Sequence, residues 1–216
     1  GLHLTLSRGP AALSHAEAPA LVRPDGRFRT NPAQAGLAYW FSTALRHQVK
    51  KEITAQFERY ARFGLPMDHA DGHQHLHVHP VIWDALVAQC ARCGVRWVRL
   101  PIEQSPRSNW RDAPMSWRLE QAALRALGKR CRRVAQAAGL RVADQVIGHR
   151  YTGRMDERRL LEALNTLTHI RSPFNGGGQG GSACAVSEVY SHPGAYAHEL
   201  DALMSERVAA HLLRLG

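Results

Sequence analysis

Five of the thirteen histidines fall within one short stretch, HADGHQHLHVHP, at residues 69–80. The candidate ligands in this stretch are His69, Asp71, His73, His75, His77 and His79. Neutral imidazoles and carboxylates bind divalent cations at about 2.0 to 2.2 Å. All six residues have odd numbers, so in an extended segment their side chains would share one face. Such a segment would cover about 30 Å at roughly 3.3 Å per residue, so one ion cannot use every histidine.

A cation held between two strands needs only a few of these side chains. His3, in the opening sequence GLHLTL, and His73, alone or with His75, form a plausible ligand set across two strands. A catalytic metal keeps one position open for water and usually takes a carboxylate as well. Asp71 is the nearest carboxylate, either as a ligand or as the acceptor that orients an imidazole.

The other histidines of the stretch are weaker candidates for metal binding. His69 is expected to support the site, whereas His77 and His79 lie just before Pro80 and are expected to cap a helix or face solvent. A stretch that only packs, or that forms the polar start of a helix, is the competing interpretation. The number of histidines together with an aspartate favours metal binding.

Three polar residues outside the stretch are further candidates. His192, in the sequence SHPG, follows an expected strand and is placed where a general acid could protonate a leaving group, although a turn can hold a histidine for structural reasons alone. Arg99 and Glu103 lie at the end of another expected strand and are candidates for substrate binding. A surface arginine is the alternative for Arg99.

Alternating strands and helices would position these side chains. Strand-like patterns cover residues 1–6, 65–71, 95–101, 140–148 and 185–190. Helical patterns cover residues 43–63, 80–93, 115–138, 155–167 and 198–215. This alternation predicts βαβ units around a parallel sheet, either open or closed into a barrel. Because the unusual polar residues gather at the carboxyl ends of strands, where (β/α) barrels build active sites, we favour a TIM-like (β/α) barrel.

The length and composition fit one domain over residues 1–216. With 44% hydrophobic and 21% charged residues, the chain has the make-up of a packed globular protein. No apolar run is long enough to span a membrane and no signal peptide is recognisable, which predicts a soluble, cytoplasmic protein. Five strands do not close a barrel, and the chain opens directly on a strand-like sequence without methionine. We therefore expect that N-terminal strands are missing.

The charge, the cysteine spacing and the glycine-rich stretch argue against nucleic-acid binding, a zinc site and a P-loop. The net charge is +10, and all but three of the 28 basic residues are arginines scattered along the chain, which favours a solvated surface over nucleic-acid binding. The lone CARC at 90–93 predicts ordinary thiols rather than a zinc site. The glycine-rich stretch 172–183 lacks the Lys-Ser/Thr of a P-loop and is expected to be a surface loop.

Four segments together resemble a known family. GLHLTL (1–6), HADGHQHLHVHP (69–80), GVRWVRLP (94–101) and SEVYSHPG (187–194) are similar, in this order, to the YdjC-like carbohydrate deacetylases, which have a distorted (β/α) barrel related to NodB proteins. RPDGRF and AGLAYWF, in the segment before residue 42, are similar to the hopanoid-biosynthesis branch, HpnK. The resemblance covers nearly the whole chain.

The resemblance implies a metal-dependent hydrolase that removes the acetyl group from an N-acetylglucosamine-type sugar, either linked to a hopanoid or part of a chitooligosaccharide. One divalent ion, magnesium or zinc, would be held by His3 and His73, and His192 would be the acid. Asp71 would hold the His73 region in its productive tautomer. The family's metal-binding aspartate and probable base lie in an Ala-Asp-Asp-Phe-Gly segment that is expected before residue 1. The chain as given is therefore expected to be an inactive fragment.

Two other classes of function stay open. A non-catalytic metal-binding module or inactive homologue would bind metal without cleaving an amide. An anionic-surface binder could use the aromatic run Tyr39, Trp40 and Phe41 with the basic residues Arg46, Lys50 and Lys51 to contact a membrane peripherally, although core packing of the aromatic side chains is the competing interpretation. The sugar carrier, the native metal and a homodimer are left open by the sequence.

Overall fold

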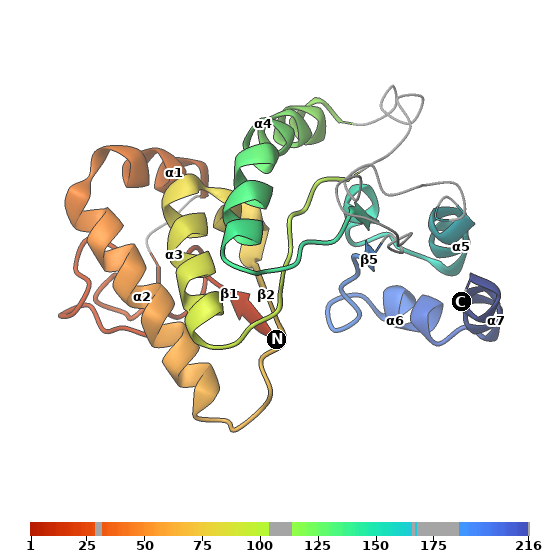
Figure 1. Ribbon diagram of the computed structural model, residues 1–216, viewed down its shortest axis with the longest axis horizontal. Coiled ribbons are helices and arrows are strands. Elements are labelled where there is room, and N and C mark those ends of the chain that lie inside the picture. The colour runs from red at the N-terminus through yellow and green to blue at the C-terminus, as the bar shows by residue number, and fades with distance from the viewer. Residues whose placement is uncertain (29–31, 104–113, 166, 168–185, 216) are drawn as a thin grey trace. The chain divides into compact units, whose positions relative to one another are not determined.

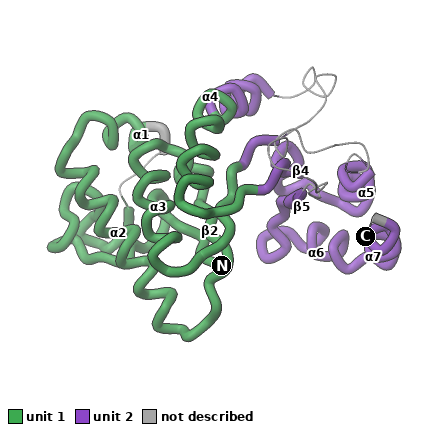
Figure 2. The backbone as a smooth tube through the Cα atoms, viewed as in Figure 1, with its two compact units in different colours: residues 1–100, 124–142 green, residues 101–123, 143–216 purple. Residues whose placement is uncertain are grey.

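The computed structural model describes residues 1–28, 32–103, 114–165, 167 and 186–215. These residues form two compact units, which are coloured separately in Figure 2. Unit 1 comprises residues 1–100 and 124–142, and unit 2 comprises residues 101–123 and 143–216. The expected glycine-rich loop at 172–183 lies outside the described residues.

Unit 1 is built on a three-stranded parallel sheet in the order β1-β2-β3. Its strands are β1 (Leu2–Leu4), β2 (His69–Gly72) and β3 (Trp97–Val98). Leu2 and Leu4 are buried while His3, between them, is exposed, which is the alternation expected of a strand with one face in the core. The register pairs His3 with Asp71. The parallel pairing predicted from the sequence is confirmed, with shorter strands than expected.

The sheet of unit 1 is accompanied by helices whose apolar residues recur every three or four positions. These helices are α1 (Pro32–Phe41), α2 (Thr43–Ala61), α3 (Pro80–Arg92) and the C-terminal part of α4 (Met115–Ala137). In α2 the buried side chains of Val49, Ile53 and Phe57 form one stripe, and Figure 1 shows α2 beside α3. The Trp83 indole of α3 donates to the Cys131 carbonyl of α4. Helix α1 was not expected from the sequence.

The histidine stretch is not extended over its whole length. Strand β2 ends at Gly72, and a 3-10 helix, η1 (His73–Val78), follows, in which Gln74 and His75 have positive φ angles of 54° and 55°. A Cβ at position 72 would lie 2.6 Å from the His77 Cβ, so glycine permits the chain to fold back closely here. The histidines therefore do not share one face. The expectation that His77 caps a helix or faces solvent is wrong, because its ring is buried.

Unit 2 contains a parallel pair of strands, β4 (Gln145–Ile147) and β5 (Ser187–Val189). Glu103 forms an isolated parallel bridge with Val146 of β4. The helices are the first residues of α4, the 3-10 turn η3 (His149–Tyr151), α5 (Glu157–Asn165), α6 (Ala197–Leu203) and α7 (Glu206–Leu215). The helices α5, α6 and α7 pack together around a small apolar core that includes Met155, Leu160 and Val208.

The C-terminal segment differs from the single helix expected over 198–215. It forms α6 and α7, separated at Met204 and Ser205. The Ser205 hydroxyl accepts from the Val208 amide and donates to Glu157, so this serine begins a new helix. An α/β fold with alternating strands and helices is otherwise confirmed. No helix among the described residues has the length and apolarity needed to cross a bilayer.

Candidate functional site

The carboxyl edge of the unit 1 sheet brings together His3, Asp71 and Arg99. His3 Nδ1 lies 2.7 Å from Asp71 Oδ1, and Arg99 Nη1 pairs with the other oxygen, Oδ2. Burial by itself raises the pKa of Asp71, but the hydrogen bond from His3 and the charge of Arg99 outweigh it and hold the pKa below its usual value. Asp71 is therefore an ionised carboxylate that accepts both hydrogen bonds.

The Asp71 carboxylate determines which nitrogen of His3 is available for binding. Because Asp71 can only accept, His3 Nδ1 carries the proton, and in the neutral ring Nε2 presents its lone pair. The His73 ring lies beside it, with ring centroids 5.8 Å apart and planes at 78°. A carboxylate behind an imidazole is the arrangement that orients histidine ligands in metal sites. Asp71 thus holds His3 as it would hold a metal-binding histidine, and His73 is the neighbouring imidazole.

A cavity of about 380 Å³ in unit 1 borders His73. Its other lining residues are Leu2, Thr5, Arg8, Gly9, Pro10, Ala12, Gln56, Arg59, Tyr60 and Phe63. Most of the cavity wall is apolar, and the basic residues Arg8 and Arg59 are among those that line it. A space of this size and character beside His73 can hold a small organic molecule.

The remaining histidines of the stretch have separate environments. His69 is exposed, and its Nδ1 lies 2.6 Å from Asp68 Oδ1. His75 is buried. His77 Nε2 donates to the Arg99 carbonyl at 2.9 Å, and burial lowers its pKa to about 4, so it is a neutral histidine that anchors the chain of Arg99. His79 accepts from the Val81 amide at the start of α3, as expected of a helix cap.

In unit 2, His192 lies just beyond β5 in a turn held by a buried carboxylate. The Glu199 side chain, which is 0% exposed, accepts from the His192 amide at 2.6 Å, the Ser191 hydroxyl at 3.3 Å and the Met155 amide at 3.3 Å. The Tyr190 hydroxyl lies 3.1 Å from His192 Nε2. The turn therefore fixes the backbone of His192, and a tyrosine hydroxyl contacts its ring.

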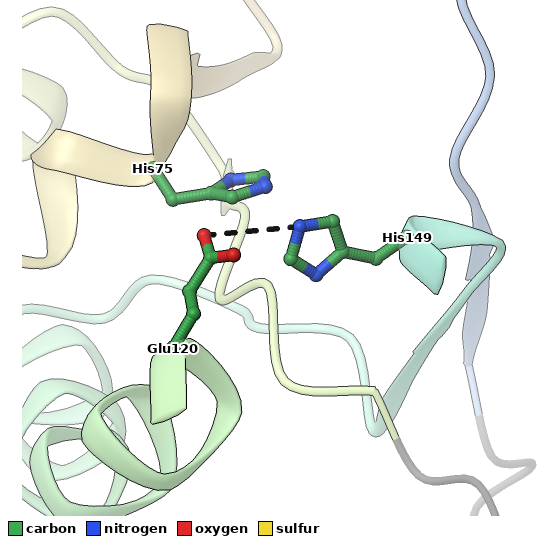
Figure 3. A group of neighbouring side chains, drawn as sticks. All are labelled: His75, Glu120 and His149. Atoms are coloured by element: carbon green, nitrogen blue, oxygen red, sulfur yellow. Dashed lines mark ion pairs between the residues drawn. The ribbon is translucent and has the colours of Figure 1, made fainter. Parts of the chain in front are cut away.

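A second polar cluster of unit 2 follows β4. The Glu103 carboxylate is buried and accepts from the Arg150 amide at 2.8 Å, which makes it a support for the β4 edge rather than an exposed contact. The Glu103 amide donates to Gln121 Oε1 at 3.2 Å, and Gln121 Nε2 lies 2.8 Å from His149 Nδ1. Glu120 Oε1 faces His149 Nε2 at 3.9 Å (Figure 3).

The structure places the residues chosen from the sequence at two strand edges, one in each unit. His3, Asp71, His73 and Arg99 gather in unit 1, with Arg99 bound to the Asp71 carboxylate. His192 belongs to unit 2. Sequence reasoning did not single out Glu199, which holds His192, or Gln121, which contacts His149. Glu199, an acidic residue in the first turn of a helix just after SHPG, carried a recognisable signal, whereas Gln121 in the middle of α4 carried none.

Comparison with known proteins shows the family to which the sequence is similar. The family model described as YdjC-like protein matches residues 1–214. A mouse protein named carbohydrate deacetylase is 33% identical over 202 residues, which cover 90% of this chain and 60% of the mouse protein. The human protein of the same name is 30% identical over 201 residues, covering 90% and 58%. This chain thus spans about 60% of the length of these curated relatives.

A solved structure shares the fold at low sequence identity. It is a proposed cellobiose-phosphate cleavage protein from Enterococcus faecalis, with a TM-score of 0.68 and 17% identity. The similarity covers 99% of this chain and 72% of that one. This likeness supports the α/β fold described above.

Proposed function

Because the chain belongs to the YdjC-like protein family, we propose that it forms part of a carbohydrate deacetylase. The reaction adds water across the amide of an N-acetylated amino sugar, breaks the C–N bond, and gives acetate and a free amine. The observation that carries this proposal is the hydrogen bond between His3 Nδ1 and Asp71, with the His73 ring beside His3. The mouse and human relatives named carbohydrate deacetylase support the choice of reaction.

We propose that His3 and His73 hold one divalent cation, with Asp71 fixing the tautomer of His3. The cation, when bound, would polarise the amide carbonyl and lower the pKa of a water molecule. Imidazole ligands suit zinc, whereas magnesium prefers oxygen ligands, so this pair of histidines favours zinc over magnesium. The hydrogen bond from His3 and the charge of Arg99 keep Asp71 ionised, so its carboxylate accepts the hydrogen bond of the His3 N–H.

His192 is proposed to protonate the departing sugar nitrogen, which would otherwise leave as a very poor anion. The amide of His192 is fixed by Glu199, and its ring nitrogen contacts the Tyr190 hydroxyl. The cavity beside His73 is proposed to receive the sugar, since aromatic and polar side chains together suit a carbohydrate ring and its hydroxyls. We also propose that the complete protein forms a (β/α) barrel and belongs to the hopanoid branch of the family.

The proposal is tested first by cation binding. In titration calorimetry with Zn²⁺, His3→Ala and His73→Ala should each remove most of the binding, because each deletes one proposed ligand. His79→Asn is the matched control from the same stretch, since asparagine can still cap α3. Acetate release from N-acetylglucosamine oligosaccharides by the complete protein should be lost in His3→Ala and His73→Ala and retained in His79→Asn. Equal loss of binding in all three variants would contradict the assigned ligands.

A peripheral membrane contact is a second candidate with an observation in its favour. Trp40 and Phe41 are 49% and 85% exposed, whereas Tyr39 is buried and donates to the Leu6 carbonyl. Core packing therefore accounts for the tyrosine only. Co-sedimentation with anionic liposomes should weaken in Trp40→Ser/Phe41→Ser if these side chains enter the interface. Unchanged binding would remove this candidate.

A further inference from the structure

The hydrogen bonds of Gln121 determine the tautomer of His149. A backbone amide can only donate, so the group that receives the Glu103 N–H must be the amide oxygen of Gln121. The NH2 group of Gln121, which can only donate, then faces His149 Nδ1 at 2.8 Å. Nδ1 of His149 must therefore be the acceptor. In the neutral ring the proton is on Nε2.

The environment of His149 keeps that ring neutral. His149 is 7% exposed and lies after β4, with its ring centroid 5.7 Å from that of Tyr190. Burial, and next the nearby His192, lower the pKa of His149 to about 4. Within the described part of unit 2, the Gln121 amide, the Tyr190 ring, His192 and the Glu120 carboxylate lie around this ring. A nitrogen that carries its proton cannot be a metal ligand, so Nε2 acts as a hydrogen-bond donor.

An acceptor faces this donor at a distance too long for a direct hydrogen bond. Glu120 Oε1 lies 3.9 Å from His149 Nε2, and the Glu120 side chain is 41% exposed (Figure 3). An oxygen placed about 2.8 Å from both atoms would accept from Nε2–H and donate to the carboxylate. A hydroxyl group has both capacities, whereas a carbonyl lacks the donor and an ammonium lacks the acceptor.

We propose that His149 Nε2–H and the Glu120 carboxylate form a recognition site for one hydroxyl group of the sugar substrate. Gln121 and Glu103 are positioning residues that hold the His149 tautomer. The proposal rests on the proposed function only in taking the ligand to be an amino sugar. Sites built to hydrogen-bond a hydroxyl reject analogues that lack it, because the buried partners are left without a hydrogen bond.

The tautomer is tested without any ligand. Nitrogen-15 NMR of the histidine-labelled protein at pH 7 should show His149 neutral with its proton on Nε2, and Gln121→Leu should release this preference. A proton on Nδ1 of wild-type His149 would overturn the inference.

The recognition site is tested by equilibrium binding of N-acetylglucosamine and its 3-, 4- and 6-deoxy analogues. One deoxy analogue should bind about 10- to 100-fold more weakly than the parent sugar, the range for a hydrogen bond to a charged group. Glu120→Ala removes the acceptor but keeps the His149 donor, so it should reduce this discrimination without abolishing it. Glu162→Ala, which removes an exposed carboxylate of α5 in the same unit, is the matched control and should keep the discrimination.

The outcomes separate this inference from the proposed reaction. Equal binding of all analogues by the wild type, undiminished discrimination in Glu120→Ala, or no binding of N-acetylglucosamine would each overturn it. Hydroxyl discrimination without acetate release would instead support the recognition site and contradict the deacetylase assignment. Acetate release without hydroxyl discrimination would support the deacetylase assignment and contradict the recognition site.

Discussion

The two units hold their principal histidines in opposite tautomers. In unit 1, His3 Nδ1 faces the Asp71 carboxylate, so Nε2 keeps a lone pair. In unit 2, His149 Nδ1 faces the Gln121 NH2 group, so Nε2 keeps a proton. Both histidines lie at the edge of a strand, and in both a side chain forms a hydrogen bond with Nδ1. Whether the outward nitrogen binds a cation or donates a hydrogen bond therefore depends on one partner atom.

The two units also differ in how their carboxylates are satisfied. Asp71 in unit 1 is paired with the Arg99 guanidinium, whereas Glu199 in unit 2 accepts two backbone amides and a hydroxyl. An ion pair fixes a side chain, while amide donors fix the backbone. The first arrangement orients a ring, and the second shapes the turn that carries His192.

The largest expected effect comes from breaking the ion pair of unit 1. Asp71→Ala should lower the free energy of unfolding by about 3 to 5 kcal/mol, because the largely buried Arg99 loses its carboxylate. Asp84→Ala, which breaks the exposed pair of Asp84 with Arg130, should cost less than about 1 kcal/mol. Urea denaturation measures both. Similar losses in the two variants would contradict the role given to burial.

The unit 2 counterpart is expected to be somewhat less costly. Glu199→Ala should lower the free energy of unfolding by about 2 to 3 kcal/mol, because buried donors, including the His192 amide, lose their acceptor. Glu206→Ala, an exposed carboxylate in the first turn of α7, is the control and should change it by less than about 1 kcal/mol. Thermal unfolding of the two variants would show whether the turn depends on Glu199.

One buried histidine in each unit should make stability depend on pH. Burial lowers the pKa of both His77 and His149 to about 4, below the 6.5 of an unfolded chain, so the unfolded state binds more protons between these values. Their contribution is present above pH 6.5 and is lost as the pH falls towards 4. At pH 5 each should cost about 2 kcal/mol relative to pH 7.

Variants that no longer titrate should flatten this dependence. His77→Gln keeps a donor for the Arg99 carbonyl, and His149→Asn keeps an acceptor for Gln121. Urea midpoints measured at pH 7 and pH 5 should differ less in each variant than in the wild type. An unchanged difference would show that folding does not lower the pKa of the histidine in question.

The smallest expected effect concerns the ring of His192. Tyr190→Phe removes the hydroxyl that lies 3.1 Å from His192 Nε2 and should lower the free energy of unfolding by about 1 kcal/mol. Urea denaturation should show this loss in Tyr190→Phe and a smaller change in the exposed control His198→Asn. Equal stability of Tyr190→Phe and the wild type would show that the hydroxyl does not hold the His192 ring.

The sequence alone determined the alternation of strands and helices, although it did not show helix α1. Apolar residues at three- and four-residue spacing placed α2 and α3 within a few positions, and the alternation in GLHLTL placed β1, because these patterns are local consequences of burial on one side. It also drew attention to His3, His73 and His192. The break between α6 and α7 was missed, since it depends on the contact of Ser205 with Glu157.

Only the tertiary structure decided which groups meet. Asp71 was expected to orient the His73 region, yet its carboxylate binds His3, 68 positions away, because β1 and β2 pair in the register that puts these residues side by side. A one-residue slip would turn one of them to the other face. Gln121 likewise gives no local signal, and its control of the His149 tautomer follows from two contacts between distant parts of the chain. Residue types determine which reactions are available, while strand register and side-chain contacts determine which nitrogen of each histidine carries the proton.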